Sequence, residues 1–191
     1  RMVLLPAPVN TGIVFVRTDV RDADNIIRAH ADSVGATKNA TTIGNASGVE
    51  IATVEHLMSA CVGLGIDNLV VEVDGAEVPI LDGSSAPFVQ VLMNAGLKPL
   101  YAPQRMIHIV QPVEVRMGAK SAAFLPSEGF DGLDLEVTIR FADKAIGGDA
   151  GRPHQLTPKT DSRPVRTSIH AAPLIFVFQS VGPCPLTQFQ F

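Results

Sequence analysis

Residues 53–73, TVEHLMSACVGLGIDNLVVEV, decide the fold of this chain, because they predict a helix followed by a buried strand. Thr53 is a favourable N-cap residue, so the helix is expected to run from Val54 to Cys61. Four apolar residues recur at i, i+3, i+4 and i+7 and therefore share one face of this helix: Val54, Leu57, Met58 and Cys61. Gly63 and Gly65 are expected to end it.

Short strands are predicted before and after this helix in the sequence, and a second helix follows it. Branched and aromatic side chains, bounded by turn residues, predict strands at Gly12–Arg17, Leu69–Val73 and Glu77–Leu81. Residues 39–50 predict two further short strands joined by a turn at Asn45–Gly48. Asp82, Gly83 and Ser84 then turn the chain into a helix at 86–94, which Gly96 closes.

The second half of the chain has a different pattern. Two prolines mark residues 99–105 as a linker. Four antiparallel strands are then predicted: Met106–Val110, Val113–Arg116, Ser121–Leu125 and Leu133–Phe141. In the last of them apolar and polar residues alternate, which is typical of a strand with one buried face. Residues 147–191 are rich in proline and contain no glutamate, so they are expected to form an atypical, largely irregular tail.

The composition argues against several classes of partner. The 191 residues carry a formal net charge of −4, with one tyrosine and no tryptophan, so no nucleic-acid surface is expected. The apolar run Ala171–Phe178 is too short to span a membrane. Cys61 and Cys184 make no disulfide framework, and with no signal-peptide pattern at the start they predict a cytoplasmic protein. The sequence makes no prediction of the oligomeric state.

Glu55 and His56 are the candidate chemical residues, since they fall in the first turn of the predicted helix. The positive end of the helix dipole favours an ionised carboxylate and a neutral imidazole. A neutral imidazole can bind a metal, and a carboxylate can accept a proton from an attacking water. The alternative is structural: a glutamate in a first helical turn is simply favourable, and one histidine does not make a catalytic zinc site, which normally has three protein ligands.

Four segments together resemble one family of enzymes: Val49–Ala60, Gly63–Asn68, Glu77–Phe88 and Pro6–Ile13. The resemblance covers about residues 3–146 and is to UDP-3-O-acyl-N-acetylglucosamine deacetylase, a zinc enzyme of lipid A synthesis in Gram-negative bacteria. It implies an α+β chain with two similar domains and the active site between them. Residues 1–98 would be a two-layer α/β sandwich that carries Glu55 and His56, and residues 106–146 the opening sheet of a second, partial domain.

The resemblance also implies roles for single residues. His56 aligns with a zinc ligand, and Glu55 aligns with the general base that activates the water attacking the N-acetyl group. The substrate would be a UDP-linked acylated glucosamine. Thr41 and Thr42 are expected to be strand residues near the mouth of the site, where they are weaker candidates for substrate contacts.

The chain also differs from the family pattern. The family supplies two more zinc ligands from a His-x-x-x-Asp pair in its second domain, whereas none of the five histidines here has an aspartate four residues later. A glycine-histidine loop and a strand are expected upstream of residue 1. After Gly147 no resemblance is expected, as a truncation or a shifted reading frame would produce. The alternative function is therefore an inactive fragment, or a nucleotide-sugar-binding module, that lacks two zinc ligands and is marginally stable.

Overall fold

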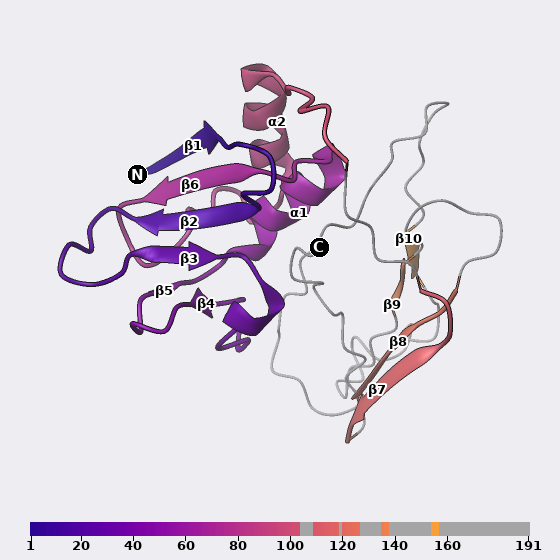
Figure 1. The fold of residues 1–191 in the computed structure, drawn as a ribbon. Helices are drawn as coiled ribbons and strands as arrows, with labels where there is room; N and C mark the ends of the chain where they lie inside the picture. The colour runs from indigo at the N-terminus through magenta and orange to yellow at the C-terminus, as the bar shows by residue number, and fades with distance from the viewer. Residues whose placement is uncertain (104–108, 119, 127–134, 138–153, 157–191) are drawn as a thin grey trace. The chain divides into compact units, whose positions relative to one another are not determined.

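The computed structural model describes residues 1–103, 109–118, 120–126, 135–137 and 154–156, which Figure 1 draws in colour. These residues belong to two compact units. The first contains residues 1–103, with a mixed sheet and two α-helices. The second contains four short strands.

A four-stranded sheet is the framework of the first unit. Its strands lie in the order β1 (Met2–Pro6), β6 (Leu69–Val73), β2 (Ile13–Arg17) and β3 (Ile26–Arg28). β6 is antiparallel to β1 and parallel to β2, and β2 is antiparallel to β3. A parallel pair needs a crossover connection, and the segment between β2 and β6 provides it with the helix α1 (Glu55–Leu64).

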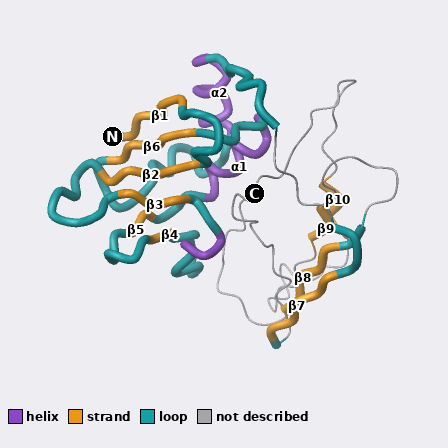
Figure 2. The backbone as a smooth tube through the Cα atoms, viewed as in Figure 1, coloured by secondary structure: helices purple, strands orange, loops and turns teal. Residues whose placement is uncertain are grey.

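The core lies between this sheet and two helices, α1 and α2 (Ala86–Ala95). Phe15 pairs with Val71 on one side and with Ile27 on the other, and all three side chains are 0 % exposed. The helices add Leu57, Met58, Cys61, Phe88 and Leu92 to the same cluster. Figures 1 and 2 show both helices on one face of the sheet. The predicted two-layer α+β arrangement is therefore confirmed.

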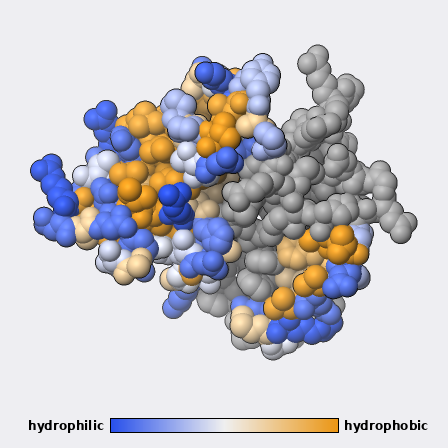
Figure 3. All heavy atoms as spheres, in the orientation of Figure 1, coloured by the Kyte–Doolittle hydropathy of each residue, from blue (hydrophilic) through white to orange (hydrophobic). Residues whose placement is uncertain are grey.

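The opposite face of the sheet carries a row of apolar side chains. Leu5 pairs with Val70, and Val70 pairs with Val14, so these three side chains form a row on the face away from the core row. Figure 3 shows apolar side chains gathered over β1, β6 and β2 on the face turned to the viewer. Among the residues that the structure describes, no helix is long and apolar enough to cross a membrane.

A small hairpin follows the short 3-10 helix η1 (Ala31–Ser33). β4 (Ile43–Gly44) pairs with β5 (Glu50–Ile51), as predicted for residues 39–50. Asn45 organises the turn: its side-chain oxygen accepts hydrogen bonds from the N–H groups of Ser47 and Val49. Its amide nitrogen donates to the carbonyls of Asp24 and Ile26, which fastens the hairpin to the start of β3.

α1 differs from its prediction at both ends. It begins at Glu55 and continues to Leu64, so Gly63 lies inside the helix and does not end it. Gly65 does end it, at φ 67°, in the left-handed region that glycine adopts without steric cost. The predicted N-cap is wrong: the cap position belongs to Val54, no side chain caps the helix, and the hydroxyl of Thr53 bonds elsewhere.

α2 agrees closely with its prediction. It runs from Ala86 to Ala95, has Pro87 in its first turn and ends at Gly96. The turn before it is fixed by Asp82, whose Oδ1 accepts from both the N–H and the hydroxyl of Ser84. The strand predicted at Glu77–Leu81 is wrong, since this segment contributes only an isolated bridge between Ala52 and Glu77.

The second unit contains two strand pairs. β7 (Val113–Met117) and β8 (Lys120–Phe124) form an antiparallel hairpin, which confirms the strands predicted at 113–116 and 121–125. β9 (Leu135–Val137) pairs antiparallel with β10 (His154–Leu156) and falls within the strand predicted at 133–141. The remainder of that prediction, most of the predicted strand 106–110 and all of the tail except β10 lie outside the described residues.

Candidate functional site

The chain enters α1 from β5 through Ala52 and Thr53. Ala52 is anchored through both of its backbone polar groups. Its N–H donates to the carbonyl of Ala76 at 2.9 Å, and its carbonyl accepts from the N–H of Val78 at 3.0 Å. This parallel bridge places residues 76–78 directly beside the residue that precedes Thr53. The approach to the helix is therefore fixed before the helix begins.

Thr53 turns the chain into α1. Its φ is 61°, in the left-handed region that β-branched residues rarely adopt, and its side chain is 5 % exposed. Its hydroxyl donates a 2.7 Å hydrogen bond to Oε1 of Glu77. Val54 then adopts helical dihedrals, so the direction of the chain changes at Thr53.

Glu55 is the first residue of α1 and is half-buried. Its Oε2 accepts a 3.1 Å hydrogen bond from the backbone N–H of Thr41. The carbonyl of Thr41 accepts in turn from the N–H of Val54 at 3.4 Å. The backbone of Thr41 thus contacts the start of α1 twice and fixes one carboxylate oxygen of Glu55.

His56 lies next in the helix and is 1 % exposed. Its ring nitrogen Nδ1 is buried and has no hydrogen-bond partner among the residues that the structure describes. A buried polar atom without a partner is costly and is uncommon in folded proteins. An imidazole with an unpartnered nitrogen, next in sequence to a carboxylate, is a candidate ligand or proton carrier, and the sequence predicts these roles for the pair.

The structure separates the two predicted threonines. Thr41 lies at Glu55, although it is the backbone of Thr41 that makes the contact. Thr42 instead closes a loop: its N–H donates to the carbonyl of Ala36, and its carbonyl accepts from the N–H of Gly35, both at 2.9 Å. Neither threonine lies within a strand, because β4 begins at Ile43. Their contact with a substrate stays a prediction.

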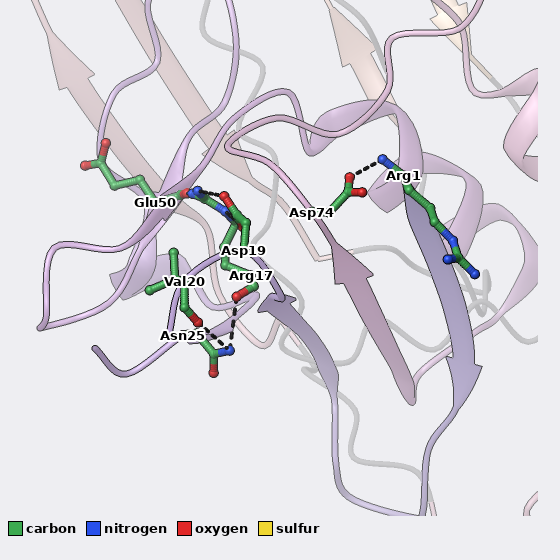
Figure 4. A network of polar contacts seen from close by, with 7 residues as sticks. All are labelled: Arg1, Arg17, Asp19, Val20, Asn25, Glu50 and Asp74. Carbon is green, nitrogen blue, oxygen red and sulfur yellow. Dashed lines mark hydrogen bonds and ion pairs between the residues drawn. The ribbon is translucent and has the colours of Figure 1, made fainter. Parts of the chain in front are cut away.

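A second polar network contacts β5 at the carbonyl of Glu50 (Figure 4). The guanidinium of Arg17 donates to both carboxylate oxygens of Asp19, at 2.8 and 2.7 Å, and to the carbonyl of Glu50. This hydrogen bonding raises the pKa of Arg17 and lowers that of Asp19. Asn25 donates to the carbonyls of Arg17 and Val20, so the β2–β3 connection is tied to the same network.

The donor set for a metal is incomplete in the described part of the chain. Within those residues no group of three or more His, Cys, Asp or Glu side chains is placed to hold a metal ion. His56 fits the role of one ligand, because its Nδ1 is buried and unpartnered. One imidazole does not make a zinc site, so any further ligands have to come from elsewhere.

Sequence reasoning missed three contributors to this site. Glu77 and Thr53 were assigned to a strand and to a helix cap, whereas they bond to each other across 24 residues. For Arg17 the sequence pattern predicts only a place in a strand. The contact between Thr41 and Glu55 spans 14 residues. Local patterns carry no signal for such pairings. The nearest clue in the sequence is that Thr41 and Thr42 precede the predicted hairpin and that Glu55 and His56 follow it.

Comparisons with known proteins identify the chain's relatives. The family model described as UDP-3-O-acyl N-acetylglycosamine deacetylase matches residues 1–169, and so extends past Gly147, where the resemblance was expected to end. The curated UDP-3-O-acyl-N-acetylglucosamine deacetylase of Phenylobacterium zucineum is 51 % identical over 150 residues, which is 78 % of this chain and 50 % of that protein.

Two further relatives carry the same name. The protein of Colwellia psychrerythraea is 48 % identical over 130 residues, 68 % of this chain and 42 % of its own length. The protein of Vibrio cholerae is 45 % identical over 151 residues, 79 % of this chain and 48 % of its own length. The chain spans about half the length of the curated relatives it matches. It belongs to the UDP-3-O-acyl-N-acetylglucosamine deacetylase family.

Proposed function

We propose that this chain carries the general base and one metal ligand of an enzyme that hydrolyses the N-acetyl group of a UDP-3-O-acyl-N-acetylglucosamine, a step of lipid A biosynthesis. Family membership supports the reaction class, and the names of the relatives support the substrate. The observation that carries the assignment to residues is the pair at the start of α1. There the half-buried carboxylate of Glu55 precedes a fully buried imidazole whose Nδ1 has no partner among the described residues.

Glu55 is suited to act as the general base. The N–H of Thr41 holds Oε2, and no hydrogen bond to Oε1 is present among the described residues, so Oε1 can accept a proton from an attacking water. The start of α1 places the positive partial charge of the helix N-terminus beside this carboxylate. The same carboxyl group, once protonated, can give its proton to the departing amine.

We assign zinc as the cofactor and His56 as one of its ligands. When bound, zinc would act as a Lewis acid toward the acetyl carbonyl and would favour the ionised form of water. At least one further ligand has to lie outside the described residues, because these contain no group of three candidate side chains. We also place the reaction in the cytoplasm, which fits the free, buried thiol of Cys61.

A second candidate function is a non-catalytic fragment or a nucleotide-sugar-binding module of the same family. Two observations favour it: the described residues contain no group of three side chains placed to hold a metal ion, and none of the five histidines of the sequence precedes an aspartate by four residues. Such a chain would keep the base and one ligand but would not turn over substrate.

Zinc stoichiometry of the purified, metal-reconstituted chain tests the proposal, with His56→Ala as the matched variant. Bound zinc that is lost in His56→Ala, together with release of acetate from the UDP-linked substrate, is the expected result for the enzyme. Zinc content equal to that of His56→Ala, with no acetate released, would leave the fragment as the correct assignment. Binding of the UDP-sugar without zinc or turnover would indicate the binding module.

A further inference from the structure

Thr53 has a backbone conformation that a threonine does not favour. Five non-glycine residues of the described chain have positive φ: Asn10, Asn39, Thr53, Leu81 and Tyr101. Of these five, only Thr53 is buried. Asparagine tolerates positive φ, whereas a β-branched residue does so only when its surroundings enforce it. Strained positions of this kind cluster at functional sites.

The enforcing contacts are visible on both sides of Thr53. Its hydroxyl donates to the carboxylate of Glu77 at 2.7 Å, a short hydrogen bond to an ionisable acceptor. The preceding residue, Ala52, is held by two backbone bonds to residues 76 and 78. Glu77 thus lies in the segment to which the backbone is already paired, and its side chain adds the bond that reaches Thr53.

The conformation of Thr53 sets where α1 begins. Ala52 is fixed by the bridge and Val54 is already helical, so Thr53 is the single residue at which the chain changes direction. The N-cap residue Val54 makes no side-chain capping bond to α1, so the first turn is held by the bond of Thr53 to Glu77 and by the contacts of Thr41 with Val54 and Glu55. Glu55 and His56 are the first two helical residues, and a change of φ at Thr53 would move both.

We propose that Thr53 and Glu77 are positioning residues, which hold the start of α1 so that Glu55 reaches Thr41 and His56 stays buried. That Glu55 and His56 perform catalysis rests on the proposed function, whereas their placement can be measured without zinc or substrate. The role differs from that of a helix cap, because the hydroxyl of Thr53 bonds to Glu77 and to no N–H of α1.

NMR of the full chain provides the test, through two reporters. The backbone amide of Thr41 senses the carboxylate of Glu55, and the imidazole nitrogens of His56 sense the surroundings of its ring. Two reference variants calibrate these reporters. Glu55→Ala gives the position of the Thr41 amide resonance when its carboxylate acceptor is removed, and His56→Gln identifies the imidazole signals by their loss. The test variants are Thr53→Val, which keeps the shape but loses the hydroxyl, Thr53→Ser, which keeps the hydroxyl, and Glu77→Ala at an exposed position.

Ser84→Ala is the matched control, because it removes a hydroxyl–carboxylate bond of 2.8 Å from the turn before α2. We expect Thr53→Val and Glu77→Ala to move the Thr41 amide most of the way to its Glu55→Ala position and to shift the His56 signals. Thr53→Ser should restore both, and Ser84→Ala should leave both unchanged.

Lower unfolding stability without movement of either reporter would show that the bond is merely structural and would overturn the proposal. If Thr53→Val does not fold, Glu77→Ala decides alone, since it alters no core residue. Failure of the zinc and acetate measurements with the expected NMR shifts would reject the proposed function and leave the positioning role standing. If the parent chain binds zinc and releases acetate, but the Thr41 and His56 signals do not move in Thr53→Val and Glu77→Ala, the proposed function stands and the positioning role is rejected.

Discussion

The backbone N–H of Thr41 donates a 3.1 Å hydrogen bond to Oε2 of Glu55, and the carbonyl of the same residue accepts from the N–H of Val54. One residue of a loop therefore contacts both the carboxylate and the backbone at the start of α1. The loop itself is closed by the pairing of Thr42 with Gly35 and Ala36. The position of the candidate base depends on a segment that precedes it by 14 residues.

Glu55→Gln separates the structural role of this contact from the chemical one. The amide oxygen of glutamine can still accept from Thr41, so we expect the urea midpoint of unfolding to stay close to that of the parent. Glutamine cannot take up a proton, so any deacetylase turnover should fall roughly 10²–10⁴-fold in kcat. Glu55→Ala, which also loses the Thr41 bond, should in addition lower the free energy of unfolding by about 1 kcal/mol. Full turnover by Glu55→Gln would show that another group is the base.

The sequence predicted elements well where local pattern and tertiary contacts agree. Leu69–Val73 is a run of branched residues between turn residues, and it became the central strand β6 with the same bounds. The second helix was predicted to within one residue, because Pro87 and Gly96 mark its ends. β1 (Met2–Pro6) has no alternation of its own and is a strand through its pairing with β6.

The errors near the site have a common cause. Thr53 has the propensity of a helix cap, yet a carboxylate 24 residues later competes for its hydroxyl. Glu77–Leu81 looked like a strand, but Pro79 has no N–H to donate, and Leu81 has a φ of 51° that a strand does not allow. The family motif located Glu55 and His56, whereas the residues that hold them could be recognised only in three dimensions.

Asn45 is predicted to be a main determinant of the hairpin's stability. Its side chain makes four hydrogen bonds, two as acceptor within the turn and two as donor to the carbonyls of Asp24 and Ile26. Asn45→Asp keeps the acceptors but sets a carboxylate oxygen against two carbonyls. We expect it to lower the free energy of unfolding by about 2 kcal/mol, from two lost bonds. Urea denaturation at neutral pH measures this loss.

Asn94→Asp is the control for that experiment, because Asn94 is exposed and bonds only to the side chain of Gln90 among the described residues. Its effect should stay within about 0.5 kcal/mol, as for most surface substitutions. Equal stability of Asn45→Asp and Asn94→Asp would mean that the hairpin is not fastened to β3 through Asn45.

The ion pair of Arg17 and Asp19 should give stability a specific pH dependence. Hydrogen bonding to Arg17 lowers the pKa of Asp19 from its ordinary 3.8, so the folded chain binds this proton less readily than the unfolded chain does. The contribution is therefore present above pH 3.8 and is lost as the pH falls through the lowered pKa. The stability difference between the parent and Asp19→Asn should shrink over that window. Asp22→Asn in the same loop is the control, and an equal pH dependence in both variants would contradict this role for Arg17.

Cys61 should be inert toward thiol reagents for as long as α1 is packed on the sheet. Its side chain is 0 % exposed, and burial raises the pKa of its thiol to about 12, so neither access nor thiolate is available at neutral pH. In a Cys184→Ser variant, where Cys61 is the single remaining cysteine, we expect iodoacetamide to label it only at the rate at which the domain opens. Labelling should accelerate with urea in step with the loss of helical circular dichroism. Rapid labelling in buffer, at the rate of the urea-unfolded chain, would show that α1 is not stably docked, and that the buried environment of His56 on the same helix is not maintained either.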